Sequence, residues 1–234
     1  MTRPIYKTAL IVGVGSGLSA SLARLLTKQG LRVALAARDT DKLKPLVEET
    51  GAKAFTVDAA DAASVAGLFD AVQAHFGSNP DVVVYNASGR LRGPLTDFDP
   101  AGVERVLAVT AFGGFLVGQQ AARRMLPQGR GAILFTGASA SVKGYARSAP
   151  FAMGKFALRG LAQSMARELG PQGIHVAHFV IDGQIREAGR EDPPGKPDGA
   201  LDPDAIAQSY VDILRQPRSA WTWELELRPW TETF

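Results

Sequence analysis

A short apolar run near the amino end is followed at once by a glycine-rich segment and then by residues at helical spacing. The run covers residues 8–12, the segment G-V-G-S-G-L-S covers 13–19, and the helical spacing covers 20–29. A continuous apolar run is typical of a parallel strand buried on both faces. Glycines after such a strand let the backbone approach a pyrophosphate, and the next helix presents unpaired N–H groups to it. This order predicts a dinucleotide-binding fold, although tight strand-to-helix turns also select glycine.

The alternation of strand and helix continues along the chain. This order predicts one α/β domain over residues 1–234, with a doubly wound sheet of seven parallel strands, helices on both faces and right-handed crossovers. Asp61 is expected to cap a helix, Gly113 and Gly114 to interrupt the longest one, and His178 to be a core residue of the sixth strand. The further strands are expected at 31–37, 53–57, 81–85, 131–136, 174–181 and 221–227, and the further helices at 41–50, 61–76, 100–125, 150–169 and 203–214.

Composition narrows the range of possible functions. The 234 residues include no cysteine, which excludes disulfides, thiolate metal sites and cysteine nucleophiles. Three scattered histidines show no metal-ligand spacing. The net charge of +3 is spread along the chain, which argues against nucleic acid as a partner. The amino end does not resemble a signal peptide and no stretch reaches membrane-spanning length, so we expect a soluble cytoplasmic protein without a membrane partner.

The end of the second expected strand bears on the choice of cofactor. In dinucleotide folds a carboxylate at this place binds a free 2′-hydroxyl of the adenosine ribose, and an arginine accommodates a 2′-phosphate. Ala37 is followed by Arg38 here. The pattern favours NADP(H) over NAD(H). Asp39 next to it weakens the pattern, and a solvated loop cation would give the same sequence.

Residues 138–155 connect the fifth expected strand to a helix, and Pro150 suits the first turn of that helix. Phe151 and Lys155 stand four residues apart and therefore share one helical face. A hydroxyl on residue 151 would make this a proton-transfer site, but phenylalanine has none. After the sixth strand the pattern dissolves between residues 184 and 201, where prolines, glycines and charges dominate, so we expect a mobile loop beside the site.

Over essentially its full length the sequence resembles the short-chain dehydrogenase/reductase family. Gly13 and Gly17 match the first two glycines of the family turn T-G-x-x-x-G-x-G, whereas Val12 and Ser19 replace its threonine and last glycine. The family turn N-N-A-G falls on residues 85–88 and is half retained. The resemblance implies a single-domain Rossmann fold and an NAD(P) cofactor. The cofactor-binding residues expected on this basis are Gly13, Ser16, Gly17, Leu18, Arg38, Asp58 at the place of the adenine-binding aspartate, Asn86, Ala87, Lys155, Gly183 and Ile185.

The catalytic half of the sequence departs further from the family. There, an Asn-Ser-Tyr-Lys set works together: tyrosine is the general acid/base, serine holds the substrate oxygen, lysine binds the nicotinamide ribose and lowers the tyrosine pKa, and asparagine anchors a proton-relay water. By register these positions are Thr110, Ala138, Phe151 and Lys155, so only the lysine is kept. The P-G pair after the sixth strand is Asp182 and Gly183 here.

Two functions from different classes remain open. In one, the chain is an NADP-dependent oxidoreductase whose reaction needs no tyrosine acid, such as hydride transfer to an activated carbon, or whose acid is Tyr145 or Asp182. Ser139 and Ser141 neighbour the vacant serine position and are further substitutes. In the other, the chain is a catalytically silent dinucleotide-binding protein that acts as a sensor or through a partner. A ligand carrier without the cofactor is a third option.

The resemblance also implies a homodimer or homotetramer in which the two long helices meet their symmetry mates. It leaves the small-molecule substrate unidentified.

Overall fold

The computed structural model describes residues 6–186, 192 and 194–233. In this part of the chain seven strands form one sheet in the order β3-β2-β1-β4-β5-β6-β7, and every neighbouring pair is parallel. The predicted doubly wound architecture is therefore confirmed. The strands are β1 (Thr8–Val12), β2 (Arg32–Ala37), β3 (Lys53–Thr56), β4 (Val82–Tyr85), β5 (Gly131–Thr136), β6 (Ile174–Ile181) and β7 (Glu224–Leu227).

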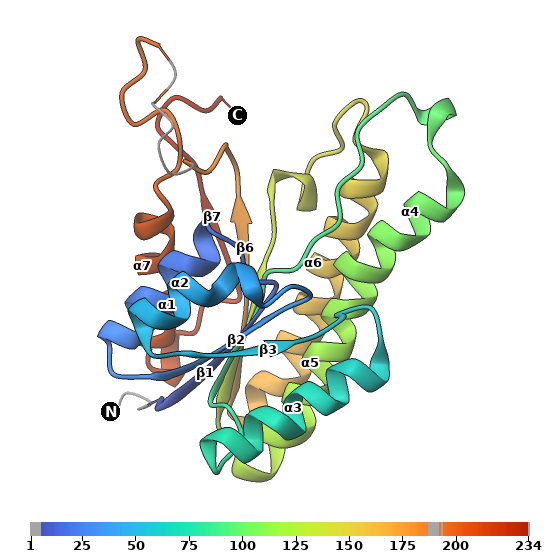
Figure 1. The fold of residues 1–234 in the computed structure, drawn as a ribbon. Coiled ribbons are helices and arrows are strands. Elements are labelled where there is room, and N and C mark those ends of the chain that lie inside the picture. The colour runs from blue at the N-terminus through green and yellow to red at the C-terminus, as the bar shows by residue number, and fades with distance from the viewer. Residues whose placement is uncertain (1–5, 187–191, 193, 234) are drawn as a thin grey trace.

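Helices cover both faces of the sheet (Figure 1). The strands β1, β4, β5 and β6 are buried along their whole length between the two helical layers, which is why apolar residues predominate in them. Such burial stabilises the fold by roughly 25 cal/mol per Å² of apolar surface. On one face lie α1 (Leu18–Lys28), α2 (Lys44–Thr50) and α7 (Pro203–Leu214). On the other face lie α3 (Ala62–Phe76), α5 (Gly113–Met125) and α6 (Ala149–Leu169). The helix α4 (Pro100–Leu107) precedes α5.

The order of the strands reverses between β1 and β4. From β1 the sheet continues through β2 to β3, whereas from β4 it continues through β5 and β6 to β7. The segments that follow the carboxyl ends of these strands gather at one edge of the sheet (Figure 1). In open parallel sheets a ligand binds at such a reversal point. The fold therefore places the candidate site there.

The long helix predicted over residues 100–125 is continuous but irregular. α4 passes into α5 through a π-helical turn at Ala108–Phe112, just before the glycine pair that was expected to interrupt it. The hydroxyl of the buried Tyr85 donates to the carbonyl of Val109 inside this turn. A side chain on Gly113 would collide with the same tyrosine. The glycine is therefore required by the close packing of this helix against β4.

The helical run Pro100–Gln128 contradicts the expectation that no stretch of the chain reaches membrane-spanning length. It is long and apolar enough, by length and composition alone, to cross a membrane. Of its apolar window, 44% is buried inside the fold. Buried core helices pass the same criteria, so the run is weak evidence for a membrane span.

Several predicted element boundaries are off by one or two residues, and two are off by three. The helix expected at residues 41–50 begins as a 3₁₀ turn, and the strand expected at 221–227 begins only at Glu224. Before that strand the ring of Trp221 stacks on His175, with the ring centroids 4.6 Å apart. The backbone of Thr222 is bonded to side chains instead of to the β6 backbone: its N–H donates to the Gln216 side chain at 2.8 Å, and its carbonyl lies 2.9 Å from the His175 ring. Asp61 caps α3 as predicted, because its carboxylate accepts the N–H of Ser64.

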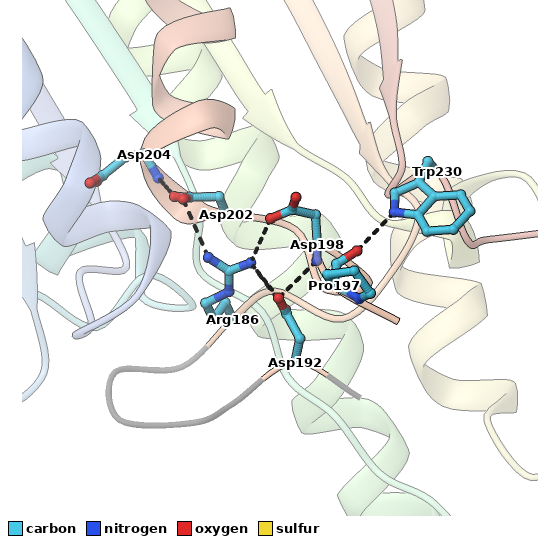
Figure 2. Close-up of polar contacts among 7 residues, drawn as sticks. All are labelled: Arg186, Asp192, Pro197, Asp198, Asp202, Asp204 and Trp230. Carbon is cyan, nitrogen blue, oxygen red and sulfur yellow. Dashed lines mark hydrogen bonds and ion pairs between the residues drawn. The ribbon is translucent and has the colours of Figure 1, made fainter. Parts of the chain in front are cut away.

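Part of the loop expected at residues 184–201 lies outside the described residues, namely 187–191 and 193. Within the described part, Arg186 contacts three carboxylates (Figure 2). Its guanidinium lies 3.0 Å from Asp192, 3.5 Å from Asp198 and 3.6 Å from Asp202. A single exposed ion pair contributes little to stability, but a shared guanidinium restrains several points of a loop at once. The mobility of this loop stays a prediction.

Two further contacts join this loop to the rest of the fold. Ile185 and Leu201 form an isolated parallel bridge between its two ends. The indole N–H of Trp230 donates to the carbonyl of Pro197 at 2.9 Å (Figure 2). The described ends of the loop are thus held beside the carboxyl edge of the sheet.

We expect Gly13→Ala to lower the free energy of unfolding by roughly 2–5 kcal/mol. Gly13 has a φ of +87°, and a Cβ there would overlap the backbone of Ala87, so backbone strain and steric overlap add. Urea denaturation measures the change. Gly15→Ala is the matched control, because a Cβ on Gly15 meets nothing within 4 Å. Equal losses in the two variants would contradict this explanation.

Candidate functional site

Two adjoining cavities open at the carboxyl ends of the strands. The first, of about 850 Å³, is lined mainly by the segments that follow β1, β2 and β3. The second, of about 1060 Å³, is lined mainly by the segments that follow β4, β5 and β6 and by the start of α6. The two share Asn86, Ser88 and Ile185 and are therefore continuous. A typical small-ligand pocket has roughly 300–1,000 Å³, so there is room for a dinucleotide and a second small molecule.

Asn86 fastens the glycine turn to the neighbouring strand. Its side-chain amide donates to the carbonyl of Gly13 at 3.1 Å and to the hydroxyl of Ser19 at 2.6 Å. Its backbone N–H donates to the carbonyl of Val12 at 2.8 Å. The N–H of Gly13 in turn donates to the carbonyl of Ala36 on β2 at 2.9 Å. The serine that replaces the last family glycine therefore takes part in holding the turn.

The amino end of α1 is suited to an anionic group. Among the described residues, no side chain caps its N–H groups, and its first turn carries no acidic residue. A Cβ on Gly15 or Gly17 would meet nothing within 4 Å, so the turn is open on that side. Ser16 and Leu18 line the same cavity. Uncapped N–H groups at a helix amino end favour phosphate, and the pyrophosphate of a dinucleotide fits this place.

Beyond the turn, the first cavity reaches the end of β2. Arg38 is exposed and lines the cavity. The Lys42 ammonium lies 3.1 Å from Asp39, and this hydrogen bond holds the pKa of the carboxyl below its ordinary value. Lys42 therefore compensates the negative charge beside Arg38. Asp58 lines the cavity after β3, and its backbone N–H donates to the Ser64 hydroxyl at 3.0 Å.

Lys155 lies in the wall of the second cavity and is only 3% exposed. Its ammonium donates to the carbonyl of Thr136, the last residue of β5, at 2.7 Å. Burial, assisted by the nearby charge of Arg90, lowers the pKa of Lys155 to about 7. An ammonium has three donors, so one bond to the protein leaves two for the hydroxyls of a bound sugar.

Phe151 lies one helical turn before Lys155, and the Lys155 ammonium is 5.9 Å from the centre of its ring. The guanidinium carbon of Arg90 is 4.4 Å from the same centre. Cations attract the face of an aromatic ring, so the ring holds Arg90 over the cavity wall. A phenyl ring offers no proton to a substrate.

Comparison with known proteins identifies the family to which a chain with this fold and site belongs. A family model described as "short chain dehydrogenase" matches residues 7–185. The chain belongs to the short-chain dehydrogenase family. D-threitol dehydrogenase from Mycolicibacterium smegmatis is 30% identical over 175 residues, which cover 73% of this chain and 67% of that protein. Membership makes this chain a short-chain oxidoreductase of the NAD(P)-binding type.

Solved structures of short-chain dehydrogenases superpose over nearly the whole chain. A crystal structure of a short-chain dehydrogenase from Rhodopseudomonas palustris is 35% identical, covers 97% of this chain and 100% of that one, and gives a TM-score of 0.82. A metagenomic short-chain oxidoreductase in complex with NADP is 27% identical, covers 97% of this chain and 98% of that one, and gives a TM-score of 0.83.

Two further positions of the catalytic set expected for a short-chain dehydrogenase are close to the second cavity. Thr110 is fully buried, and its hydroxyl accepts the N–H of Gly89 at 2.9 Å. Ala138 lines the cavity, and its N–H donates to the hydroxyl of Ser141 at 3.1 Å. The fold therefore brings Ala138 to the same cavity as Lys155, while the Thr110 hydroxyl is engaged with the backbone.

The two residues expected as substitute acids lie in different environments. Asp182 is 2% exposed, and its Oδ2 atom lies 3.0 Å from the Lys143 ammonium and 3.3 Å from the Arg228 guanidinium. Two cations thus occupy the Oδ2 atom of this carboxylate. Tyr145 lines the second cavity and is 45% exposed, so its phenol is accessible.

A buried polar network lies behind the second cavity. The Ser141 hydroxyl is 3.4 Å from the Nε2 atom of His178, whose Nδ1 atom is 3.1 Å from Glu224. Glu224 accepts two hydrogen bonds from Arg159. Burial lowers the pKa of His178 to about 4, so the imidazole is neutral at pH 7. Both Ser141 and His178 are fully buried, and His178 is the core residue that the sequence predicted.

The sequence reasoning missed three arginines that line the second cavity. Arg90 and Arg92 lie in R-L-R-G, directly after the turn that follows β4, and Arg147 lies just before α6. The only signal in the sequence was the pair of basic residues next to a cofactor-binding turn. Such pairs are common in exposed loops, and only the tertiary structure shows that these side chains share a cavity.

We expect Lys155→Met to remove a pH-dependent part of the stability. With its pKa lowered from 10.5 to about 7, Lys155 binds fewer protons in the folded than in the unfolded chain between these pH values, so the free energy of unfolding rises with pH there. The slope reaches about 1.4 kcal/mol per pH unit for one proton. Urea unfolding at several pH values between 6.5 and 9.5 measures it.

In the Lys155→Met variant this slope should be reduced by that amount. Lys53→Met serves as the control, since Lys53 is an exposed lysine on β3. A variant with the same slope as the native protein would mean that Lys155 is not desolvated.

Proposed function

We propose that this chain is an NADP(H)-preferring short-chain oxidoreductase that transfers hydride to or from a small molecule without the tyrosine acid of its family. The observation that carries the proposal is the wall of the second cavity. There Lys155, Phe151 and Ala138 line one cavity, and the sequence register assigns them to the family lysine, tyrosine and serine positions. The cofactor would supply or accept the hydride. The glycine turn, the α1 amino end and Lys155 would bind the cofactor.

Phenylalanine and alanine change what the site can do to a carbonyl oxygen. A positioned acid contributes roughly 10²–10⁴ in rate, and a hydrogen-bond donor to the developing oxyanion about 10²–10³. Phe151 and Ala138 supply neither. The reaction proposed is therefore one that makes a smaller demand on an acid, such as hydride transfer to an activated carbon, or one that uses Tyr145. The cation pairs of Asp182 argue against that residue as the acid.

The preference for NADP(H) is supported by the charges at the end of β2. Arg38 is exposed at the first cavity, and Lys42 compensates the carboxylate of Asp39. An arginine at this place accommodates a 2′-phosphate, whereas NAD-binding members of dinucleotide folds use a carboxylate. A metagenomic short-chain oxidoreductase with a TM-score of 0.83 to this chain was solved in complex with NADP.

We expect Arg38→Ala to weaken NADPH binding by roughly 10- to 100-fold, because a hydrogen bond to a charged group contributes about 1.5–3 kcal/mol. NADH, which has no 2′-phosphate, should bind with little change. Calorimetry or nucleotide fluorescence measures both dissociation constants. Lys53→Ala is the control for removal of a positive charge elsewhere on the sheet. Equal losses for the two nucleotides would refute the assignment of Arg38.

A second candidate function is a catalytically silent nucleotide-binding protein. It is favoured by the residues at the positions expected for proton handling: Phe151 has no hydroxyl, Ala138 has no side-chain donor, and the Thr110 hydroxyl is engaged with Gly89. Under this reading Lys155 serves nucleotide binding alone. The two candidates differ in whether NADPH oxidation accompanies any substrate.

We expect the double variant Ala138→Ser with Phe151→Tyr to gain carbonyl reduction. Residue 151 lies beside Lys155, so a phenol there would approach an ammonium that favours its ionised form. The gain should be at least 10²-fold over the parent, from restoring a positioned acid. A panel of ketones and aldehydes followed by NADPH oxidation measures it, with each single variant as control. No gain with intact NADPH binding would show that the cavity itself has diverged.

A further inference from the structure

Three arginine side chains line the second cavity from two separate segments. Arg90 and Arg92 follow β4, and Arg147 precedes α6. No carboxylate in the described part of the chain pairs with any of the three guanidinium groups. Burial and the charge of Arg92 lower the pKa of Arg90. Like charges placed together on a cavity wall repel one another, and an anion that binds there relieves this repulsion.

Contacts within the fold restrain the two segments that carry these arginines. The N–H of Gly93 donates to the carbonyl of Arg147 at 3.0 Å, which joins the two segments. Arg147 has a φ of +61°, a left-handed conformation that is uncommon outside glycine and persists where the surroundings determine it. The Arg90 guanidinium lies over the ring of Phe151. The backbone that carries Arg147 and the guanidinium of Arg90 are therefore positioned by the fold, while all three arginine side chains are exposed to the cavity.

The other charges of the cavity leave this wall positive. Among the described residues, its lining includes two carboxylates, Asp182 and Glu232. The negative charge of Asp182 is paired with the positive charges of Lys143 and Arg228. Glu232 is exposed near the carboxyl end. Lys155 adds a further basic group on the wall shared with Phe151.

We propose that Arg90, Arg92 and Arg147 form an anion-binding subsite for the substrate, which then carries a carboxylate or phosphate group in addition to its reacting carbon. A guanidinium matches both groups, because its planar fork donates two parallel hydrogen bonds. The phosphates of the cofactor are provided for separately by the α1 amino end in the first cavity. The inference rests on the proposed function, since it assigns the substrate class of that same site.

The test uses matched pairs of carbonyl compounds that differ in charge. Dihydroxyacetone phosphate is compared with dihydroxyacetone, and 4-oxopentanoate with its methyl ester, by calorimetric titration into the full-length protein saturated with NADPH. We expect the anionic member of at least one pair to bind about tenfold tighter or more than its neutral partner, because charge-assisted hydrogen bonds are the strong ones. The pair with the larger preference distinguishes phosphate from carboxylate.

Two variants assign the preference to the arginines. Arg92→Gln and Arg147→Gln should each reduce it by about tenfold, while NADPH affinity stays within about twofold of the native value. Arg123→Gln, which removes an exposed arginine of α5, is the matched control and should change neither quantity. Equal binding of charged and neutral members, binding of neither, or an unchanged preference in the variants overturns the subsite. A loss of NADPH affinity in the variants assigns the arginines to the cofactor and overturns it as well.

Failure of the native protein to bind NADPH would contradict the proposed function and not the subsite. The same titrations are then made on the protein without nucleotide. Loss of the charge preference in Arg92→Gln and Arg147→Gln under those conditions would still support anion binding, and its persistence would overturn it.

Discussion

The close approach of the turn after β1 to the segment after β4 is the constraint on which the site depends. Gly13 lies against the backbone of Ala87 with no space for a side chain, and Asn86 binds the turn through both its amide and its backbone. This contact brings the amino end of α1 and the segments after β4 to the same edge of the sheet. Because both cavities share Asn86, the contact also makes them continuous.

The charged groups around the second cavity are arranged in three ways, with different consequences. Lys155 is buried with a neutral carbonyl as its partner, so desolvation lowers its pKa. Asp182 is buried with two cations, so its charge is satisfied within the protein. The arginines on the wall have no acidic partner among the described residues, and their charge is left for a ligand. Only the last arrangement offers guanidinium charge that has no partner carboxylate in the described part of the chain, whereas Lys155 offers its two remaining N–H donors.

The residues proposed to bind the nucleotide and those at the positions expected for proton transfer lie in different parts of this structure. The proposed nucleotide-binding residues are mostly backbone groups and glycines of the β1 turn, which are fixed by the packing of strand against helix. The positions expected for proton transfer lie at the start of α6 and in the segment after β5, where a residue such as Phe151 is compatible with an intact helix. A short-chain dehydrogenase fold can therefore keep its nucleotide site while its chemistry changes.

Local patterns in the sequence were enough to predict the order of strands and helices, the single parallel sheet and the position of the glycine turn. Continuous apolar runs, glycines and caps such as Asp61 are governed by burial and by sterics within a few residues. The π-helical turn before Gly113, the two cations at Asp182 and the contact of Arg90 with Phe151 arise from long-range packing. These contacts join residues far apart in the chain, so no local pattern encodes them. Their energies depend on desolvation and charge, which are set only when the segments pack together.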